Sequence, residues 1–440
     1  KTRFMGISKV DGIMAPGVPF ILGYQDRGFA DYAVQNRWLT ADTILNTAYM
    51  MTHSENFNFR STIEPFRGLR IDLTANRRIS NNFSAYYIPD ANGNFPDSTR
   101  SPIYSGNFSM SYITLGTSFE KVSSDNNYVS ANFNRFIENT VIISERLANS
   151  RQTSDPGYNP DIDPETGLPI EGPYKNGYDV TSQEVLIPAF LATYANRDPN
   201  RIGLDALPSI WDILPNWRVT FDGLNRLEFF KKHFRSITLS HIYRSTYDIG
   251  AYRTNLYYND DNGFRGLDYN FLPEFDIAAV SLNEQFSPLI NIDMVWKNGI
   301  TTRAEIKKSR TLSLSLSNNQ LTQINNDEIV FGTGYRFNDL QIVIKTGGGQ
   351  KEFKSDLNLR ADVSIRDNVT VMRKIVEETN EPTAGQRIIT LKFTADYVLS
   401  DRFNLRFFFD RIVNKQPYIA RTFPTYNTNV GFSIRFTLSQ

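Results

Sequence analysis

The chain has 440 residues, with 47 basic and 47 acidic side chains and no cysteine. The balanced charge gives no electrostatic footprint for nucleic acid, and the lack of cysteine excludes disulfides and thiolate chemistry. Aromatic residues make up 13% of the chain, although the mean hydropathy is only −0.38. No stretch approaches the roughly 18 apolar residues of a membrane helix. This combination suits a β-sheet membrane protein, in which polar lumen-facing residues dilute the lipid-facing ones.

Residues 1–56 predict an irregular segment, punctuated by proline and glycine. The chain begins at Lys1 without an apolar signal segment, so we expect a fragment or mature portion of a longer protein. Alternation of apolar and polar residues begins near Phe57 and predicts barrel strands over residues 57–143, including one over Asn127–Ile143. A long turn-rich loop is predicted over 88–102.

Residues 144–215 interrupt the alternation. Ser154–Pro169 is dense in proline, glycine and aspartate, and cannot pair in a sheet. Ser182–Ala195 predicts a short helix, which Pro188 is expected to confine to its second half. We interpret 144–215 as one large folded extracellular loop, with a separate small domain as the alternative.

Barrel strands resume over 216–440 and run to the chain end. Tight connections are predicted at Asn338-Asp339, Asp367-Asn368 and Ser400-Asp401, and Asn298-Gly299 is a two-residue hairpin signal. The longer connections are predicted at 318–327, 379–387 and 414–425. Short periplasmic turns and long external loops are typical of outer-membrane barrels. This alternation of short and long connections places 88–102, 144–215 and 248–273 outside the cell and the C-terminus in the periplasm. We expect about fifteen strands in total.

The last strand, Tyr426–Leu438, shows the alternation most clearly. Its bulky positions are predicted to face lipid, and they are Val430, Phe432, Ile434, Phe436 and Leu438. Its small and polar positions are predicted to face the lumen, and they are Asn429, Ser433, Arg435 and Thr437. An ordinary strand of a soluble sandwich is the alternative, because a single barrel strand is a weak signal.

Motifs for catalysis and for metal or cofactor binding are few. The three histidines stand far apart, no nucleophile elbow occurs, and an enzyme has little support. Asp161, Asp163 and Glu165 have the spacing of half a calcium loop. Gly172 stands at the twelfth place, where such a loop has glutamate, so a solvated turn is favoured over calcium. We expect no cofactor and no catalytic residue.

Six long stretches resemble one protein family. They are Glu64–Arg77, Leu186–Ala195, Leu214–Leu224, Phe286–Met294, Arg310–Leu321 and Gly431–Leu438. Together they are similar to the C-terminal region of the SprA (Sov) family, the outer-membrane translocon of the type IX secretion system of Bacteroidota. The resemblance extends over nearly the whole chain and rests on structural rather than catalytic residues.

The resemblance implies the last portion of a very large single-chain barrel that exports gliding adhesins and secreted enzymes in a folded state. Its implied partners are outer-membrane lipid, a PorV-type barrel, a periplasmic plug protein, a peptidyl-prolyl isomerase and the rest of the same chain N-terminal to Lys1. The implied location is the outer membrane of a Gram-negative bacterium, with a periplasmic C-terminus.

The sequence therefore predicts an all-β fold, an antiparallel up-and-down portion of a transmembrane barrel with a large extracellular loop insertion. We expect that this chain alone cannot close, because bacterial single-chain barrels have an even number of strands. Its unpaired edges are predicted at Phe57–Ala75 and Tyr426–Leu438. A self-contained porin or transporter barrel and a surface β-rich adhesin are the alternatives.

Overall fold

The structure is a computed structural model, and most of the chain is described by it. The described residues are 9–10, 13–14, 18–23, 28–40, 42, 44, 47–90, 92, 94–96, 102–123, 126–258, 265–266, 269–346, 349–400, 403–416 and 423–436. None of the helices in these ranges is long and apolar enough to cross a membrane.

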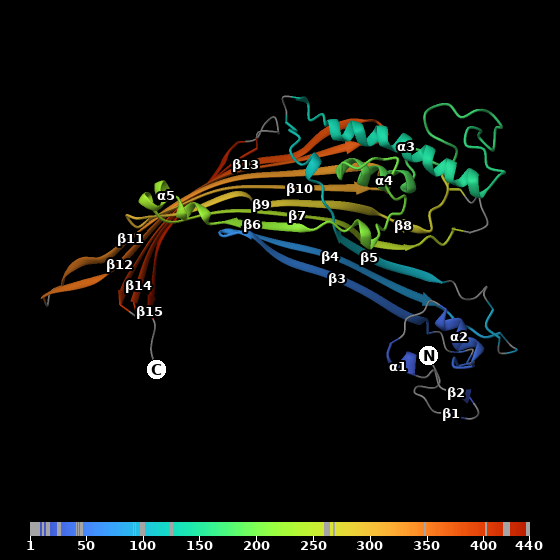
Figure 1. Ribbon diagram of the computed structural model, residues 1–440, viewed down its shortest axis with the longest axis horizontal. Coiled ribbons are helices and arrows are strands. Elements are labelled where there is room, and N and C mark those ends of the chain that lie inside the picture. The colour runs from blue at the N-terminus through green and yellow to red at the C-terminus, as the bar shows by residue number, and fades with distance from the viewer. Residues whose placement is uncertain are drawn as a thin grey trace.

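Thirteen strands form one large antiparallel sheet, which makes the fold all-β (Figure 1). Its strands are β3 (Tyr49–Phe66), β4 (Leu69–Ala85), β5 (Ile103–Ser111), β6 (Asn216–Phe221), β7 (Phe234–Thr254), β8 (Phe275–Ile277), β9 (Ala279–Trp296), β10 (Ile300–Ser315), β11 (Gln320–Thr346), β12 (Gly349–Lys374), β13 (Thr379–Ser400), β14 (Phe403–Lys415) and β15 (Thr425–Phe436). Sequence neighbours pair along most of the sheet, so the order is up-and-down, as predicted.

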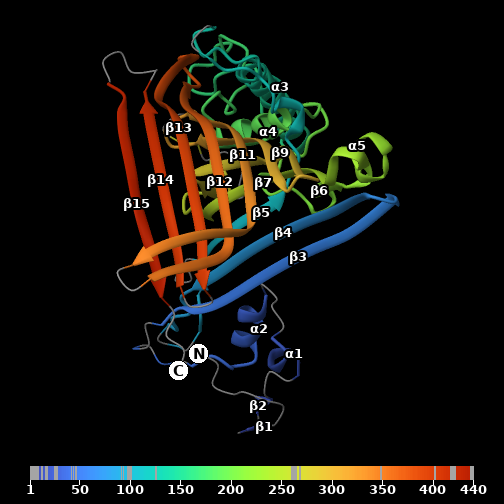
Figure 2. The same cartoon turned by 90° about the vertical axis from the view of Figure 1, so that its left-hand side faces the viewer.

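The hydrogen-bonded path runs from β15 at one edge to β3 at the other. Among the described strands, β15 pairs with β14 and β3 pairs with β4. β3 starts at the end of the sheet where the helices α3 and α4 lie, and β15 finishes at the opposite end (Figures 1 and 2). The predicted edge at Tyr426–Leu438 corresponds to β15, whereas the predicted edge at Phe57–Ala75 is only partly right: its first part belongs to the edge strand β3, and its last part belongs to β4, which has partners on both sides.

Residues 112–215, here called the helical insertion, connect β5 to β6. These two strands occupy successive parts of one position, because each pairs with both β4 and β7. The insertion contains α3 (Ala131–Ser154), α4 (Gln183–Tyr194) and the short 3₁₀ turns Leu115–Thr117 and Ile210–Asp212. Figure 1 shows α3 and α4 lying over one half of the sheet.

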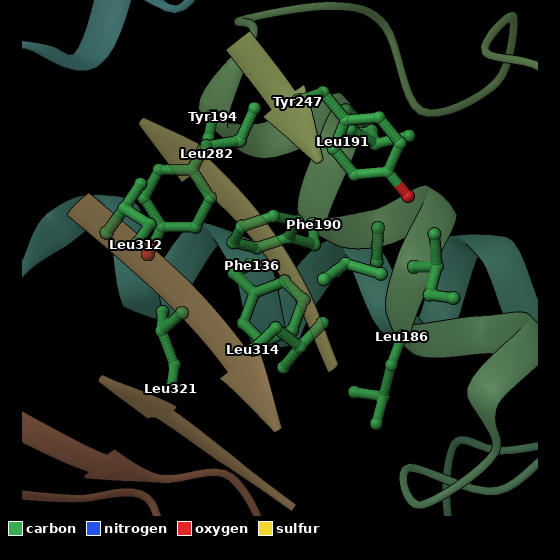
Figure 3. Close-up of a cluster of buried hydrophobic side chains, with 14 of the residues drawn as sticks. Phe136, Leu186, Phe190, Leu191, Tyr194, Tyr247, Leu282, Leu312, Leu314 and Leu321 are labelled. Atoms are coloured by element: carbon green, nitrogen blue, oxygen red, sulfur yellow. The ribbon is translucent and has the colours of Figure 1, made fainter. Parts of the chain in front are cut away.

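The main core joins the helical insertion to the sheet. Phe136 and Phe190, from α3 and α4, are fully buried against Leu282, Leu312 and Leu314 of β9 and β10 (Figure 3). The helix α4 is buried along nearly all its length, because it lies between α3 and the sheet. Burial of this many large side chains, each worth about 1.5–3 kcal/mol, fixes the insertion to the sheet.

Three short helices lie outside this core. The N-terminal part contains β1 (Lys9–Val10), β2 (Ile13–Met14), α1 (Val18–Ile21) and α2 (Phe29–Gln35). Ala33, Trp38 and Leu39 form a small separate cluster there. The helix α5 (Glu228–His233) follows the 3₁₀ turn Gly223–Arg226 and lies at the end of the strands away from α3. The predicted irregular segment 1–56 thus includes helices, and β3 begins within it, at Tyr49.

The predicted strand Asn127–Ile143 is wrong, because this stretch begins the 24-residue helix α3. The Ser130 hydroxyl caps the helix by accepting a hydrogen bond from the Phe133 amide at 3.1 Å. The buried side chains Phe133, Phe136 and Ile143 then follow a helical period rather than a period of two. The inserted segment is consequently longer than the predicted 144–215, and residues 57–143 are not all strand.

The predicted helix at Ser182–Ala195 is confirmed as α4, but Pro188 does not confine it. Four of the predicted connections are also wrong. Most of 318–327 lies within β11 and Asp367-Asn368 lies within β12, and 379–387 belongs to β13. Asn338-Asp339 is a bulge within β11, where Asp339 has φ of 56°. These errors divided continuous strands, so the sheet has thirteen strands rather than about fifteen.

Candidate functional site

The sheet has one apolar face that crosses every strand position, here called the belt face. Residues paired across neighbouring strands share a face, and Phe331, Val363 and Leu391 are paired in this way on β11, β12 and β13. Ile329 and Phe331 are more than half exposed. The belt face contains further exposed large side chains, which are Phe57, Phe59, Ile63, Phe66, Ile290, Ile306, Phe337, Val363, Ile365 and Leu391.

The structure places the predicted lipid-facing residues of the last strand on this face. Val430, Phe432, Ile434 and Phe436 are all exposed, and they pair with Phe409, Phe407, Leu405 and Phe403 of β14. The rings of Phe432 and Phe407 lie 5.0 Å apart. Leu438 and Thr437 lie outside the described residues. The alternation in β15 thus continues a pattern of the whole sheet.

The opposite face is polar and charged. The predicted lumen-facing residues Asn429, Ser433 and Arg435 lie there, paired with Asp410, Arg406 and Asn404. Ion pairs follow the same face over several strands. They are Arg70–Asp72 (3.1 Å), Arg303–Glu305 (2.9 Å), Arg366–Glu328 (3.0 Å), Arg360–Asp362 (3.0 Å), Arg406–Asp396 (2.6 Å) and Arg336–Asp356. Basic and acidic groups alternate, so the face is well hydrated without a strong excess of either charge.

A hollow of about 730 Å³ opens on the polar face between β9 and β14. Much of its lining is charged, with Arg303, Arg336, Arg360, Lys392 and Arg406 on the basic side and Asp293, Asp362 and Asp396 on the acidic side. Gly332 and Gly334 of β11 add no side chains to this lining. A surface of this kind contacts water and polar protein surfaces rather than hydrocarbon.

A transverse row of charges crosses the belt face and divides it into two halves. Lys308, Asp327, Asp367 and Arg387 are successive register partners on β10, β11, β12 and β13. Lys308 pairs with Asp327 at 3.0 Å, and Arg387 pairs with Asp367 at 2.6 Å. On one side of this row, the belt-face positions of β11, β12 and β13 hold only apolar residues, tyrosine and threonine, as far as residues 337, 357 and 397. The charged row therefore marks the boundary of this apolar region.

Aromatic side chains continue this boundary on the neighbouring strands. Phe286 of β9 is the register partner of both Lys308 and Tyr243. Trp217 of β6 stacks on Tyr243 with 4.4 Å between ring centroids, and the ring of His241 lies 6.3 Å from Trp217. Charged pairs and aromatic rings thus stand at one level across the sheet, here called the upper boundary, and Phe286 and Tyr243 of this group are buried.

A second aromatic group stands toward the other end of the strands, here called the lower boundary. Phe234 and Trp296 lie 4.3 Å apart on β7 and β9, and Phe66 packs with Phe221 at 6.3 Å. On β11 the ring of Phe337 lies 4.5 Å from that of Tyr335. Aromatic girdles of this kind flank the apolar band of membrane barrels on both sides.

The spacing of the two boundaries matches a membrane. On β11, ten residue steps separate Asp327 from Phe337. At about 3.4 Å per step and a strand tilt of about 45°, the height is about 24 Å. The apolar band of an outer-membrane barrel is about 25 Å tall.

The same face continues beyond the upper boundary, where the helical insertion covers it. A buried ion pair joins Arg310 of β10 to Glu284 of β9 at 3.0 Å. The other carboxylate oxygen of Glu284 accepts hydrogen bonds from Thr114 (2.7 Å) and Ser118 (2.6 Å) of the insertion. Arg310 donates to the carbonyl oxygen of Thr117 at 2.6 Å. This network anchors the start of the insertion.

Sequence reasoning missed this network, since its members are up to 196 residues apart. Arg373 of β12 is a second buried cation, and it donates to the Tyr128 carbonyl at 2.7 Å. The only sequence signal was the presence of Arg310 and Arg373 at positions that the alternation assigns to the apolar face.

The predicted calcium-like loop does not assemble into a metal site. Asp161 pairs with Lys175 at 2.7 Å, and Asp163 accepts a hydrogen bond from the Glu165 amide at 2.8 Å. Over the described ranges, no group of three or more histidine, cysteine, aspartate or glutamate side chains could hold a metal ion.

Comparison with known proteins gives no match, either to a protein-family model or to a curated protein.

Proposed function

We propose that the chain is a segment of the wall of a very large outer-membrane β-barrel that conducts folded proteins in type IX secretion. The observation that carries the proposal is the belt face. On β10 to β13 it is apolar and exposed between two boundaries about one membrane apart, with Arg411 of β14 as a charge inside the band. The opposite face is charged. In this assignment the belt face contacts lipid, and the polar face lines the passage.

The polar face suits a passage for folded proteins. Exposed apolar patches bind other proteins, whereas mixed charges of both signs on a hydrated surface favour neither capture nor exclusion of a passing chain. The ion pairs on this face are largely exposed, and such pairs are worth only about 0–1 kcal/mol each. They can be hydrated or rearranged as cargo moves along them.

In the described part of the chain β3 and β15 do not pair with each other, which favours a wall segment over a self-contained barrel. The hydrogen-bonded path has eleven strands, an odd number, so β3 enters at one end of the sheet and β15 leaves at the other. Unpaired backbone groups in lipid cost several kcal/mol each. Other strands must cover both edges, most simply strands of the same polypeptide N-terminal to Lys1.

The sequence resemblance supplies the rest of the proposal. It supports gliding adhesins and secreted enzymes as cargo, and a PorV-type barrel, a periplasmic plug protein and a peptidyl-prolyl isomerase as partners. With the C-terminus in the periplasm, the helical insertion and the loops at its end of the sheet are extracellular.

Cargo transit can be tested with a photo-crosslinking residue placed in the full-length protein, in its own bacterium. Ser364 on the polar face and Val363 on the belt face are neighbours on β12, so each is a matched control for the other. We expect residue 364 to capture secreted proteins in transit and residue 363 to capture none. Equal capture at the two positions, or no capture of secreted proteins at 364, would overturn the proposal.

A conductance measurement separates the alternatives. The 440-residue chain alone, added to lipid vesicles, should float with the lipid and give no stable single-channel current in planar bilayers. Stable channels would replace the wall segment with a self-contained barrel. A chain that stays in the aqueous fraction would favour the adhesin.

A further inference from the structure

The helical insertion has its own exposed apolar side chains beside the upper boundary. Phe119 is 58% exposed, Val129 is 45% exposed and Trp211 is 92% exposed. They come from three separate parts of the insertion, and none belongs to the belt face itself. We call these three residues the rim.

Phe119 lies at the level of the charged row. Its ring is 5.4 Å from that of Phe286, and Phe286 is the register partner of Lys308. The segment before it is fixed, because Thr114 and Ser118 donate hydrogen bonds to the buried Glu284. The exposed side of the Phe119 ring therefore lies where the uncovered half of the belt face meets the helical insertion.

Val129, in the segment before α3, is held beside β12 at a similar level. The preceding residue, Tyr128, is buried with Val369 and Val371, and its carbonyl oxygen accepts a hydrogen bond from Arg373. Val369 is only two residues beyond Asp367 of the charged row. Val129 is therefore exposed close to the boundary while its neighbour is fully packed.

Trp211 extends the rim toward β6. It lies in a 3₁₀ turn with a capping box formed by Ser209 and Asp212, and Arg197 binds Asp212 at 2.9 Å. Six residues later, Trp217 stacks on Tyr243 at the upper boundary. Among the described residues, no side chain covers the ring of Trp211, which is 92% exposed.

We propose that the rim inserts into the headgroup region of the bilayer that surrounds the belt face, so that the helical insertion rests on the membrane surface. Tryptophan and other amphipathic side chains are enriched at membrane interfaces, and the rim adjoins a surface of apolar residues that ends at the same level. This continuity favours lipid over a protein partner as the occupant. The inference rests on the proposed membrane location of the belt face.

The test uses the full-length protein in vesicles made of lipids brominated at shallow or deep positions of the acyl chain. A fluorescent amino acid is incorporated at one position at a time, in place of Trp38, Trp211 or Trp296, so each variant reports a separate place. Trp296 at the lower boundary reports whether the sheet is in the membrane at all. Trp38, buried in the N-terminal cluster, is the control that lipid should not reach.

For residue 211 we expect quenching by shallow bromines that is about twofold or more stronger than quenching by deep bromines, as for residues at the interface. If residue 296 is quenched but residue 211, like residue 38, is not, the proposal that the rim inserts into the membrane is wrong, and the proposed function is unaffected. If residue 296 is unquenched as well, the membrane location fails, and the rim fails with it.

A second measurement covers the case in which the fluorescent variants do not fold. A photo-crosslinking residue in place of Trp211 in the full-length protein should capture lipid, whereas one in place of Trp38 should capture none. Failure to capture lipid at residue 211 would contradict the proposal, as would capture of a second protein there instead of lipid.

Discussion

The two halves of the belt face differ in what lies on them, although their sequences alternate in the same way. On β10, Leu312 and Leu314 are at most 1% exposed beneath α4, whereas Ile306 of the same strand and face is 41% exposed. The helical insertion covers the first half. Within the described structure no protein covers the second, and we propose that lipid does.

The covered half of the belt face contains charged side chains. On β10 to β13, the belt-face positions of the uncovered half contain none. Glu284, Arg310 and Arg373 are buried beneath the insertion, and each has polar partners there. A protein cover can supply such partners at fixed positions, but hydrocarbon cannot. The comparison teaches that the polarity of a strand position depends on its cover as well as on its face.

The largest expected effect comes from the buried ion pair of the covered half. Glu284→Ala leaves Arg310 buried without its counter-charge, and breaking such a pair costs about 3–5 kcal/mol. We expect this loss of unfolding free energy for the chain in vesicles, together with faster proteolysis of the helical insertion.

The matched control is an exposed pair of the polar face. Asp396→Ala, which removes the partner of Arg406, should cost less than about 1 kcal/mol. The double variant Glu284→Leu with Arg310→Met should recover much of the loss, since apolar residues can replace a buried pair. Equal effects of the two single variants would contradict the distinction between the covered half and the polar face.

In the uncovered half, an introduced charge should be costly on one face only. Val363→Arg is expected to cost about 2–4 kcal/mol, and the neighbouring Ser364→Arg about 0–1 kcal/mol, because only the first faces lipid. Phe432→Arg and Ser433→Arg form the same pair on the last strand. Folding yields and unfolding curves in vesicles measure both pairs, and similar losses on the two faces would defeat the assignment.

Truncation of an apolar side chain should separate the two halves on a single strand. Leu312→Ala leaves a cavity beneath α4 and should cost about 2–5 kcal/mol. Ile306→Ala should cost about 1 kcal/mol or less, since lipid chains are as apolar as the side chain and move into the space. Unfolding of the two variants in the same vesicles compares them, and a larger loss for Ile306→Ala would reverse our account.

The smallest effect concerns pH and the helical insertion. Burial in the first turn of α4 raises the pKa of Glu184 from 4.5 to about 7, although Arg151 opposes this shift. Because the folded pKa lies above the unfolded pKa, the stabilisation is complete below about 4.5 and is lost as pH rises through about 7. We expect Glu184→Gln to be more stable than the parent chain by about 1–2 kcal/mol at pH 8.

Protection of α4 from hydrogen exchange, measured from pH 5 to pH 8, tests this expectation. The parent chain should lose protection over that range, and Glu184→Gln should lose less. Glu165, exposed in the same insertion, is the control, and Glu165→Gln should follow the parent chain.

The sequence predicted the parts of the fold that depend on local pattern. The alternation from Ile290 onward located most of the later strands, and the apolar run around Phe190 located α4. It did not reveal α3, because Phe133 and Phe136 stand within a stretch that was assigned to the period of a strand. The Ser130 cap was the local signal that could have separated the two.

Long-range pairing explains the other failures. Judged only by their neighbours in sequence, Asp327 and Asp367 resemble turn residues. In the sheet they form ion pairs with Lys308 and Arg387. The ion partners lie about 20 residues away in sequence, so no local pattern identifies them. For the same reason the sequence showed one apolar face without showing that the helical insertion covers half of it.

The central claim is that lipid covers the uncovered half of the belt face, and spin labels along β12 test it most directly. A spin-labelled residue is placed at one position at a time, from Leu357 to Val371, in the full-length protein in vesicles. We predict that accessibility to oxygen exceeds that to a water-soluble nickel complex at Leu359, Val363 and Ile365. The order should reverse at Ser364, and both should be low at Val371. Equal accessibility to the nickel complex at Val363 and Ser364 would contradict the account.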